Sequence, residues 1–458
     1  MAVEKEIIVA IEFGSSKIRG AAGCKNIDGS IQVLDVEQVD ARNCIRKGRV
    51  YNIDKTVVCL KTILEKMEVA LNQRIDRVFV GIGGQSLRAK KNKVSRQFAT
   101  KTVISQEIVD SLLKSNKGAV YPGCEILDVV PQEYRVGLDA TTDPVGVLGS
   151  QIEGTFLNVV ARTEMKEYIL RCVEACGIEV AGIFVSPMVL AECVLTDMER
   201  RSGCALVDFG YGTTTVAVYK SNLLRHLAVI PLGGQSITQD ICSQQVEDDE
   251  AENLKVKYGS AYSDAGADEL TKNVLANNGR TIEERVLVEM VEAREEEILS
   301  NVSAQIRNSG YQDKLLAGVV VSGAAANVQN IDKAISARLK AEKMRFVRTV
   351  PLDLHAVRAE FVVKDGSLNT LFSLLSRGNK DCTSPLPVVE VATGLPGEQI
   401  PEDESQERTQ GQGQGRDTAE QEGGHETEEK QEKEETKPRK KSRIKKWLES
   451  VTKIITED

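Results

Sequence analysis

The chain has 458 residues, a formal net charge of −9 and an aromatic content of 4%. Its basic residues are concentrated at the C-terminal end, so the sequence offers neither a broad phosphate-binding face nor a supply of stacking platforms, and nucleic acid is not an expected partner. The length is too great for one compact core and predicts two lobes or several subdomains.

From the N-terminus to about Lys380, apolar runs typical of strands alternate with amphipathic patterns typical of helices. The predicted strands cover residues 7–11, 78–82, 157–161, 205–208, 215–219 and 318–322. The predicted helices cover residues 55–73, 166–175, 284–305 and 331–340. This alternation predicts an α/β protein.

The first predicted strand ends in a glycine turn that carries a carboxylate and two hydroxyls. Its residues are Glu12, Gly14, Ser15 and Ser16, and a second strand follows at 18–23. Glycine permits a tight reversal and the close approach of a ligand, while exposed N–H groups and hydroxyls can bind phosphate oxygens. A carboxylate at the end of the strand can hold Mg²⁺ through water.

A second turn of the same kind follows the predicted strand at 205–208. It contains Asp208, Gly210, Gly212, Thr213 and Thr214. One such turn is more often the tip of an ordinary hairpin than a binding site, but the repetition favours two turns that hold one polyphosphate from both sides. The predicted metal-binding residues are Glu12 and Asp208, each acting through water.

A third segment follows the strand at 318–322 and contains small residues suited to the close approach of a base or ribose. Gly323 and Ala324 stand at its turn. The sequence from Gly81 to Ser86 superficially resembles a dinucleotide-binding loop but lacks the final glycine, and the chain contains no P-loop motif.

Ten cysteines are scattered without a C-x-x-C pair, and residues 1–11 lack the pattern of a secretory signal, so we expect a reduced, cytosolic environment. His226, His355 and His425 are far apart in sequence, which favours neither a zinc site nor a histidine-based triad. No run approaches the roughly 20 apolar residues of a membrane-spanning helix.

Residues 381–437 are rich in Glu, Gln, Gly, Lys and Thr, which predicts a disordered linker. Residues 438–458 predict an amphipathic helix that lies on a membrane surface. Its expected lipid contacts are Ile444, Lys445, Lys446, Trp447, Leu448, Val451 and Ile455. A helix that docks on the protein body or on a partner is the alternative, but the basic flank, the long linker and the tryptophan favour the membrane.

The two turns and the third segment together resemble the actin, Hsp70 and sugar kinase superfamily. Within it, further motifs resemble the FtsA family, the bacterial cell-division homologues of actin. These motifs are Val130-Pro-Gln-Glu-Tyr134, Asp143-Pro-Val-Gly146, Leu224-Arg-His226, Val229-Ile-Pro231-Leu-Gly233 and Ala251-Glu252 with Lys255 and Tyr258-Gly259. The resemblance covers residues 7 to about 378, and the amphipathic C-terminus is shared.

This resemblance implies an actin-like two-lobe fold with a duplicated ribonuclease H-like core. The expected boundaries are 1–84 and 162–203 for the first lobe, 85–161 for an inserted subdomain, 204–380 for the second lobe, 381–437 for the linker and 438–458 for the terminal helix. It also implies ATP and Mg²⁺ between the lobes, with Gly233, Glu252 and Lys255 at the nucleotide. Arg294 matches a helix that the family presents to partner subunits, although a solvated charged face explains that helix equally well.

The implied function is an ATP-binding scaffold rather than an enzyme. Such a scaffold forms filaments of its own copies and anchors the tubulin homologue FtsZ at the cytoplasmic face of the cytoplasmic membrane, as a peripheral membrane protein. It recruits later division proteins through the inserted subdomain. A chaperone-like ATPase and a metabolite kinase of the same superfamily are the alternatives, and neither explains the linker with its basic terminal helix.

Four positions depart from the superfamily pattern. Glu12 and Thr215 each stand where other members have aspartate. Tyr211 and Ala324 each stand where other members have glycine. No residue can be named as the one that activates a water, so the catalytic residues stay unassigned, and ATP binding is more strongly implied than ATP hydrolysis.

Overall fold

The computed structural model describes residues 6–263, 273–276, 279 and 281–386. The predicted membrane helix, and the predicted linker from residue 387 onward, lie outside these residues. The chain divides into the units Met1–Val389 and Glu390–Asp458, and the described residues all belong to the first. Within the described ranges, no helix is both long enough and apolar enough to cross a membrane.

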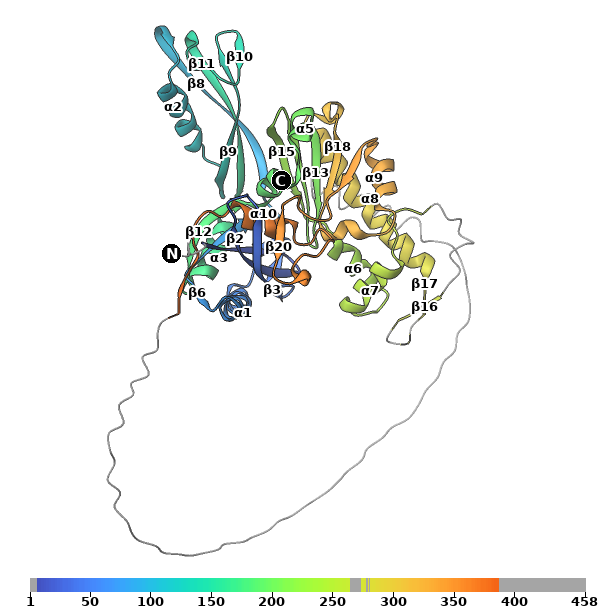
Figure 1. Cartoon of the computed structure of the whole chain (residues 1–458). Coiled ribbons are helices and arrows are strands. Elements are labelled where there is room, and N and C mark those ends of the chain that lie inside the picture. The colour runs from blue at the N-terminus through green and yellow to red at the C-terminus, as the bar shows by residue number, and fades with distance from the viewer. Residues whose placement is uncertain (1–5, 264–272, 277–278, 280, 387–458) are drawn as a thin grey trace, which may run out of the picture. The chain divides into compact units, whose positions relative to one another are not determined.

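The first lobe is built on a six-stranded sheet with two crossover helices. Its elements are β1 Ile7–Phe13, β2 Lys17–Lys25, β3 Ile31–Asp40, α1 Ile53–Leu71, β7 Arg77–Ile82, α3 Thr163–Glu174, β12 Glu179–Val185 and β20 Leu354–Ala356. The strand order is β12-β7-β1-β2-β3-β20 (Figure 1). β1, β2 and β3 form an antiparallel meander, and β7 and β12 run parallel to β1.

The second lobe repeats this arrangement. Its elements are β13 Cys204–Phe209, β14 Thr214–Lys220, β15 Leu223–Ile230, α6 Gly234–Cys242, α7 Asp248–Tyr258, α8 Glu284–Asn308, β18 Gly318–Ser322, α9 Ile331–Leu339 and β19 Met344–Phe346. The order β15-β14-β13-β18-β19, with an antiparallel meander followed by parallel strands, matches β3-β2-β1-β7-β12. The predicted duplicated core is therefore confirmed.

The helix α1 shows how the sequence fixes the ends of an element. At its start the side chain of Asn52 accepts a hydrogen bond from Lys55 N at 2.9 Å, which satisfies a backbone donor that the helix leaves unpaired. At its end Asn72 adopts a left-handed conformation with φ of 51°, which asparagine tolerates. The buried face comprises Thr56, Leu60, Ile63, Leu64 and Met67, at the spacing of an amphipathic helix.

Two helices, α4 Ser186–Val194 and α10 Asn369–Arg377, pack against each other where the lobes meet. One continuous apolar core contains residues of both helices, of the first sheet and of one face of the second sheet, including Leu206, Ala217 and Val320. The opposite face of the second sheet packs with α8 and α9 in a separate core. The lobes are therefore joined by apolar packing, and that packing positions the glycine turns of β1 and β13.

The inserted subdomain lies between β7 and α3 in the chain. Its elements are β8 Arg88–Val103, α2 Gln106–Lys117, β9 Cys124–Val136, β10 Asp139–Thr141 and β11 Leu148–Arg162. The strands form an antiparallel sheet in the order β10-β9-β11-β8, which extends away from the two lobes (Figure 1). A small apolar core of its own includes Leu112, Ile152 and Phe156.

The insert also contacts the second lobe. Arg88 of β8 pairs with Ala228 of β15, so the insert and the second lobe share one nine-stranded sheet. The buried side chain of Gln132 donates to Leu224 O at 3.0 Å and accepts from Arg225 Nη1 at 3.0 Å. These contacts give a structural role to two motifs of the sequence, the one around Gln132 and the one around Arg225.

We expect Asn116→Ala to destabilise the insert by about 1–3 kcal/mol, because it leaves a buried amide without its partner. Asn116 and Asn158 are fully buried and exchange hydrogen bonds of 2.6 and 3.2 Å, and Asn158 also donates to the hydroxyl of Tyr121 at 2.9 Å. Hydrogen exchange should show the loss of protection in β8, β9 and β11. The exposed Asn43→Ala is the control, and equal exchange in both variants contradicts the prediction.

The C-terminal part of the described chain returns to the first lobe. β20 pairs with β3, and β21 Thr383–Pro385 pairs with β6 Gln73–Ile75. Cys382 is fully buried, and its N–H donates to Ile7 O at 2.8 Å. Pairing with the first lobe thus holds residues 382–385, which follow the expected end of the second lobe at residue 380 and fall in the expected linker that starts at residue 381.

Candidate functional site

The turns after β1 and β13 have the same backbone geometry. Gly14 N donates to Lys17 O at 3.1 Å, and Gly210 N donates to Thr213 O at 2.9 Å. A Cβ atom on Gly14 would lie 2.7 Å from Lys17 O, and one on Gly210 would lie 2.8 Å from Thr213 O. Each turn therefore requires its glycine.

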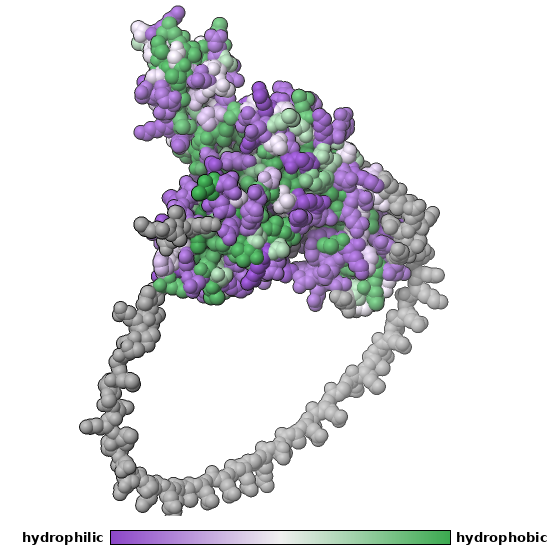
Figure 2. Space-filling model, in the orientation of Figure 1, coloured by the Kyte–Doolittle hydropathy of each residue, from purple (hydrophilic) through white to green (hydrophobic). Residues whose placement is uncertain are grey.

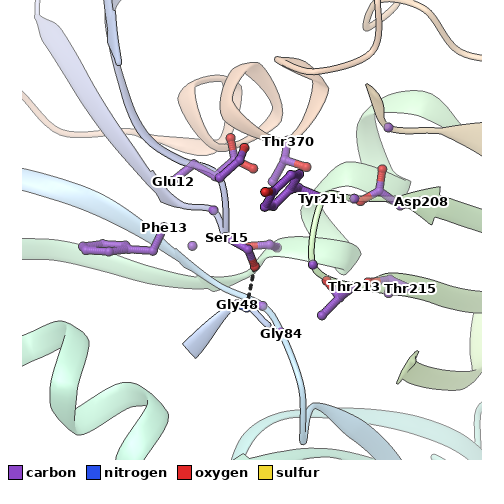
Figure 3. A pocket seen from close by; sticks show the side chains of 18 of the residues that line it. Glu12, Phe13, Ser15, Gly48, Gly84, Asp208, Tyr211, Thr213, Thr215 and Thr370 are labelled. Carbon is purple, nitrogen blue, oxygen red and sulfur yellow. Dashed lines mark hydrogen bonds between the residues drawn. The ribbon is translucent and has the colours of Figure 1, made fainter. Parts of the chain in front are cut away.

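The two turns also touch each other. A Cβ atom on Gly212 would lie 2.7 Å from Ser15 Oγ, so only glycine allows this approach. Ser15 Oγ accepts a hydrogen bond from Gly48 N at 2.7 Å (Figure 3). This contact uses the oxygen of the hydroxyl as acceptor and leaves its proton available for donation to a ligand.

A cavity of about 150 Å³ lies between the turns, and we call it the phosphate-end cavity (Figure 3). Ten of the predicted site residues line it: Glu12, Gly14, Ser15, Ser16, Asp208, Gly210, Gly212, Thr213, Gly323 and Ala324. A neighbouring cavity of about 350 Å³, the nucleoside-end cavity, is lined by Glu252 and Lys255. The two cavities share Ser16, Tyr211 and Ala324.

Two predicted residues line neither cavity. Thr214 is fully buried and its hydroxyl donates to Leu232 O at 2.9 Å, so it serves the fold. Gly233 lies at the start of α6, and a Cβ atom there would lie 2.5 Å from Gly210 O. The close packing of α6 on the second turn therefore accounts for this glycine.

Two carboxylates face the phosphate-end cavity. Burial raises the pKa of Glu12, although the Arg19 guanidinium, 3.5 Å away, opposes this shift. Burial first, and then the charge of Glu12, raise the pKa of Asp208 to about 6, against a hydrogen bond from Ser322. A divalent cation between the carboxylates would relieve their repulsion, so this pair fits Mg²⁺ bound through water.

Arg19 of β2 is a site residue that the sequence reasoning missed. It lines the phosphate-end cavity, its side chain is 13% exposed, and its Nε is buried without a hydrogen-bond partner among the described residues. The signal was present, because a four-residue turn places position 19 opposite Glu12 in the hairpin. At the second turn the equivalent residue opposite Asp208 is Thr215, which also lines the cavity.

The nucleoside-end cavity rests on a buried lysine. Lys255 is 5% exposed, and its Nζ donates to Gly234 O at 3.2 Å, Thr238 Oγ1 at 3.0 Å and Glu252 Oε2 at 2.6 Å. These bonds tie α7 to α6 and orient the partly exposed Glu252 carboxylate at the cavity. Lys255 therefore positions Glu252 through a fixed network.

The buried carboxyl of Glu295, on α8, experiences the positive charge of Lys255. It is 1% exposed, and its Oε2 has no hydrogen-bond partner among the described residues. Burial raises its pKa to about 8, although the positive charge of Lys255 acts in the opposite direction. Sequence patterning could not find this group, because its position on α8 continues the apolar face of the helix.

Arg294 of α8 is engaged within the protein. Its Nε and Nη2 donate to the two carboxylate oxygens of Asp240 at 2.7 and 2.8 Å, and Nη1 contacts Glu297. The side chain is largely buried. Arg294 thus ties α8 to α6, the helix that begins at the second turn.

Two ribonuclease H-like cores, with paired glycine turns at one cleft, define the actin-like class of fold. Among solved structures, the PilM-PilN type IV pilus biogenesis complex matches with a TM-score of 0.53 and 12% identity over 81% of this chain and 98% of that chain, which shows the fold. The family model "Cell division protein FtsA" matches residues 205–360, and "SHS2 domain inserted in FTSA" matches residues 84–160.

Sequence relatives give the family. The cell division protein FtsA of Porphyromonas gingivalis is 31% identical over 330 residues, which span 71% of this chain and 69% of the relative. FtsA of Pseudomonas aeruginosa is 30% identical over 329 residues, 71% of this chain and 79% of the relative. The chain belongs to the FtsA family of cell division proteins.

Proposed function

We propose that this chain is an ATP-binding, polymerising scaffold of cell division that anchors FtsZ to the cytoplasmic face of the cytoplasmic membrane. Family membership supports the cell-division role. The observation that carries the nucleotide-binding part is the contact between two equivalent glycine turns at one cavity, with a carboxylate on each turn.

For the phosphate groups, the proposal assigns roles to residues of both turns. The hydroxyls of Ser15, Ser16 and Thr213 and the turn amides donate to phosphate oxygens. The Arg19 guanidinium neutralises phosphate charge. Glu12 and Asp208 hold the waters of Mg²⁺, which supplies charge neutralisation when bound.

For the nucleoside, Glu252 accepts hydrogen bonds from ligand hydroxyls, and Lys255 keeps its carboxylate in place. Gly323 has a φ of 92°, and a Cβ atom there would lie 2.3 Å from Phe209 O, so the third segment keeps glycine at this position. We assign no residue to the activation of water, and the proposed role is that of a binding scaffold.

The membrane and filament parts of the proposal follow from the C-terminal sequence. Residues 438–458 carry the apolar stripe and the basic flank, and such a short segment binds lipid reversibly. A filament that presents many copies of the segment binds by avidity. ATP-linked assembly thereby converts brief membrane contact into lasting contact. The inserted subdomain is the part that contacts later division proteins.

Removal of residues 438–458 should abolish flotation of the purified protein with anionic liposomes. The full chain should float, and more strongly with Mg²⁺-ATP than without it, because assembly adds avidity. Sedimentation of filaments without lipid is the control and should be equal for both proteins. Undiminished flotation of the shortened chain would refute the membrane role, and an absent ATP effect would refute the coupling to assembly.

A further inference from the structure

We infer that Tyr211 determines which ligands enter the cleft freely, because its ring closes the passage between the phosphate-end and nucleoside-end cavities. A ligand that spans both cavities has to displace the ring, whereas a ligand confined to one cavity does not. This inference rests on the proposed nucleotide site and adds a selection step to it.

The passage is defined by the residues that line both cavities. These are Ser16, Tyr211 and Ala324, and only Tyr211 has a large side chain. In the view of Figure 3 the ring of Tyr211 appears between Glu12 of the first turn and Asp208 of the second lobe. Among the shared residues, the ring of Tyr211 is therefore the one group large enough to separate the two spaces.

Charged residues of the nucleoside-end cavity act on the hydroxyl of Tyr211. Burial raises the pKa of its hydroxyl, and the charges that act on it are those of Arg42, which lowers it, and of Glu252, Asp248 and Asp40, which raise it. All four charged residues line the nucleoside-end cavity. The hydroxyl of Tyr211 is therefore within electrostatic reach of the nucleoside-end cavity, although the backbone of this residue belongs to the second turn.

The backbone on both sides of Tyr211 is fixed. Tyr211 O accepts from Gln235 N at 2.7 Å, and Gly210 O accepts from Gly234 N at 3.1 Å. On the other side, Gly212 is in contact with Ser15. Opening of the passage therefore falls to rotation of the half-buried side chain.

The fold itself does not require a ring at this position. The first turn has the same geometry, and the residue equivalent to Tyr211 there is Ser15, with Glu12 and Gly14 matching Asp208 and Gly210. The first turn thus shows that this turn geometry forms with a small residue at the position of Tyr211. Tyr211→Ser is therefore the matched variant, because it gives the second turn the residue of the first.

The test compares a spanning ligand with its two parts. The ligands are Mg²⁺-ATP, adenosine and Mg²⁺-pyrophosphate, with a fluorescent ATP analogue for stopped-flow rates. Because a site available only in a minor conformation loses affinity by the fraction of that conformation, Tyr211→Ser should raise the association rate and the affinity for ATP by about tenfold. The affinities for adenosine and pyrophosphate should change by less than about twofold, because neither ligand displaces the ring.

Two further variants separate the ring from the hydroxyl and from effects on folding. Tyr211→Phe keeps the ring and should behave like the wild type, while Tyr211→Trp enlarges it and should slow ATP association. Tyr262→Ala, which removes a half-buried tyrosine outside the two cavities, should change nothing.

The outcomes distinguish this inference from the proposed function. Equal ATP rates in the wild type, Tyr211→Ser and Tyr211→Trp overturn the inference while the nucleotide site stands. If Tyr211→Ser raises the affinities for ATP, adenosine and pyrophosphate equally, the inference is also overturned, because the ring then affects all ligands and not only those that span both cavities. A wild-type protein that binds none of the three ligands overturns the proposed site and the inference together.

Discussion

Asp208→Asn is expected to lower the affinity for Mg²⁺-ATP by about 100-fold, which corresponds to about 2.7 kcal/mol. At pH 7 the Asp208 carboxyl is mostly ionised, because its raised pKa of about 6 still lies below 7. The substitution removes one of the two charges that face the proposed cation while it keeps the shape of the side chain. Titration with a fluorescent ATP analogue, with and without Mg²⁺, measures the effect.

The same substitution should stabilise the nucleotide-free protein at pH 7. A carboxyl with a raised pKa makes its full contribution to stability below its unfolded pKa, here 3.8, and loses that contribution as the pH rises to about 6. At about 1.4 kcal/mol per pKa unit, the loss at pH 7 is at most about 3 kcal/mol. Asparagine does not ionise and avoids this loss of stability, so the denaturation midpoint of Asp208→Asn at pH 7 should be higher than that of the wild type.

The control and the pH dependence make this prediction specific. Asp139→Asn changes an exposed aspartate of the insert and should alter neither ATP binding nor stability. Wild-type affinity for Mg²⁺-ATP should weaken as the pH falls through about 6, because protonation of Asp208 mimics the substitution. If the affinity of Asp208→Asn for ATP depends on Mg²⁺ as strongly as that of the wild type, the carboxylate pair does not hold the cation and the proposed site is wrong in this respect.

Glu295→Gln should make the stability of the protein less dependent on pH. The pKa of Glu295 is raised from 4.5 to about 8 by burial, so the folded protein keeps a proton that the unfolded chain releases. Stability from this group is complete below pH 4.5 and declines until about pH 8, by up to about 1.4 kcal/mol per pH unit. Glutamine has no proton to release and removes this decline.

Urea denaturation of the wild type and the variant at pH 5 and pH 8 measures this effect. The stability of the variant relative to the wild type should rise by several kcal/mol between the two pH values, which follows from the shift of more than three units. Glu289→Gln, on the exposed side of the same helix, should leave the wild-type slope in place. Parallel pH profiles for Glu295→Gln and the wild type would show that Glu295 is ionised in the folded protein.

The sequence predicted those elements that are marked by a continuous apolar run or by one apolar face. The strands at β1, β7, β13 and β18 are buried runs, and the helices α1 and α8 have one buried face. β8 was missed because its 16 residues are mostly exposed or half-buried and polar, so no apolar run marks it. β20 was missed because three residues carry too little pattern, and only their pairing with β3, more than 300 residues earlier, defines them.

The candidate site was predicted where local sequence determines local geometry. The turns at Gly14 and Gly210 follow from glycine chemistry, and their shared cavity follows from duplication of the core. Thr214 and Thr215 alternate along β14, so only one of them faces the cavity, and the sequence did not show which one. The contact of Lys255 with α6 and the burial of Glu295 depend on helix packing, which no local pattern reveals.

The insert is attached to both lobes, so its tilt depends on how the two lobes are oriented. Its chain leaves and re-enters the first lobe between β7 and α3, yet its sheet and Gln132 hold on to β15 of the second lobe. If the lobes rotate relative to each other, the insert cannot follow both, so the Arg88–Ala228 pair and the Gln132 contacts must bend or separate. A change in the tilt of the insert therefore has to be accompanied by a change at β15 of the second lobe.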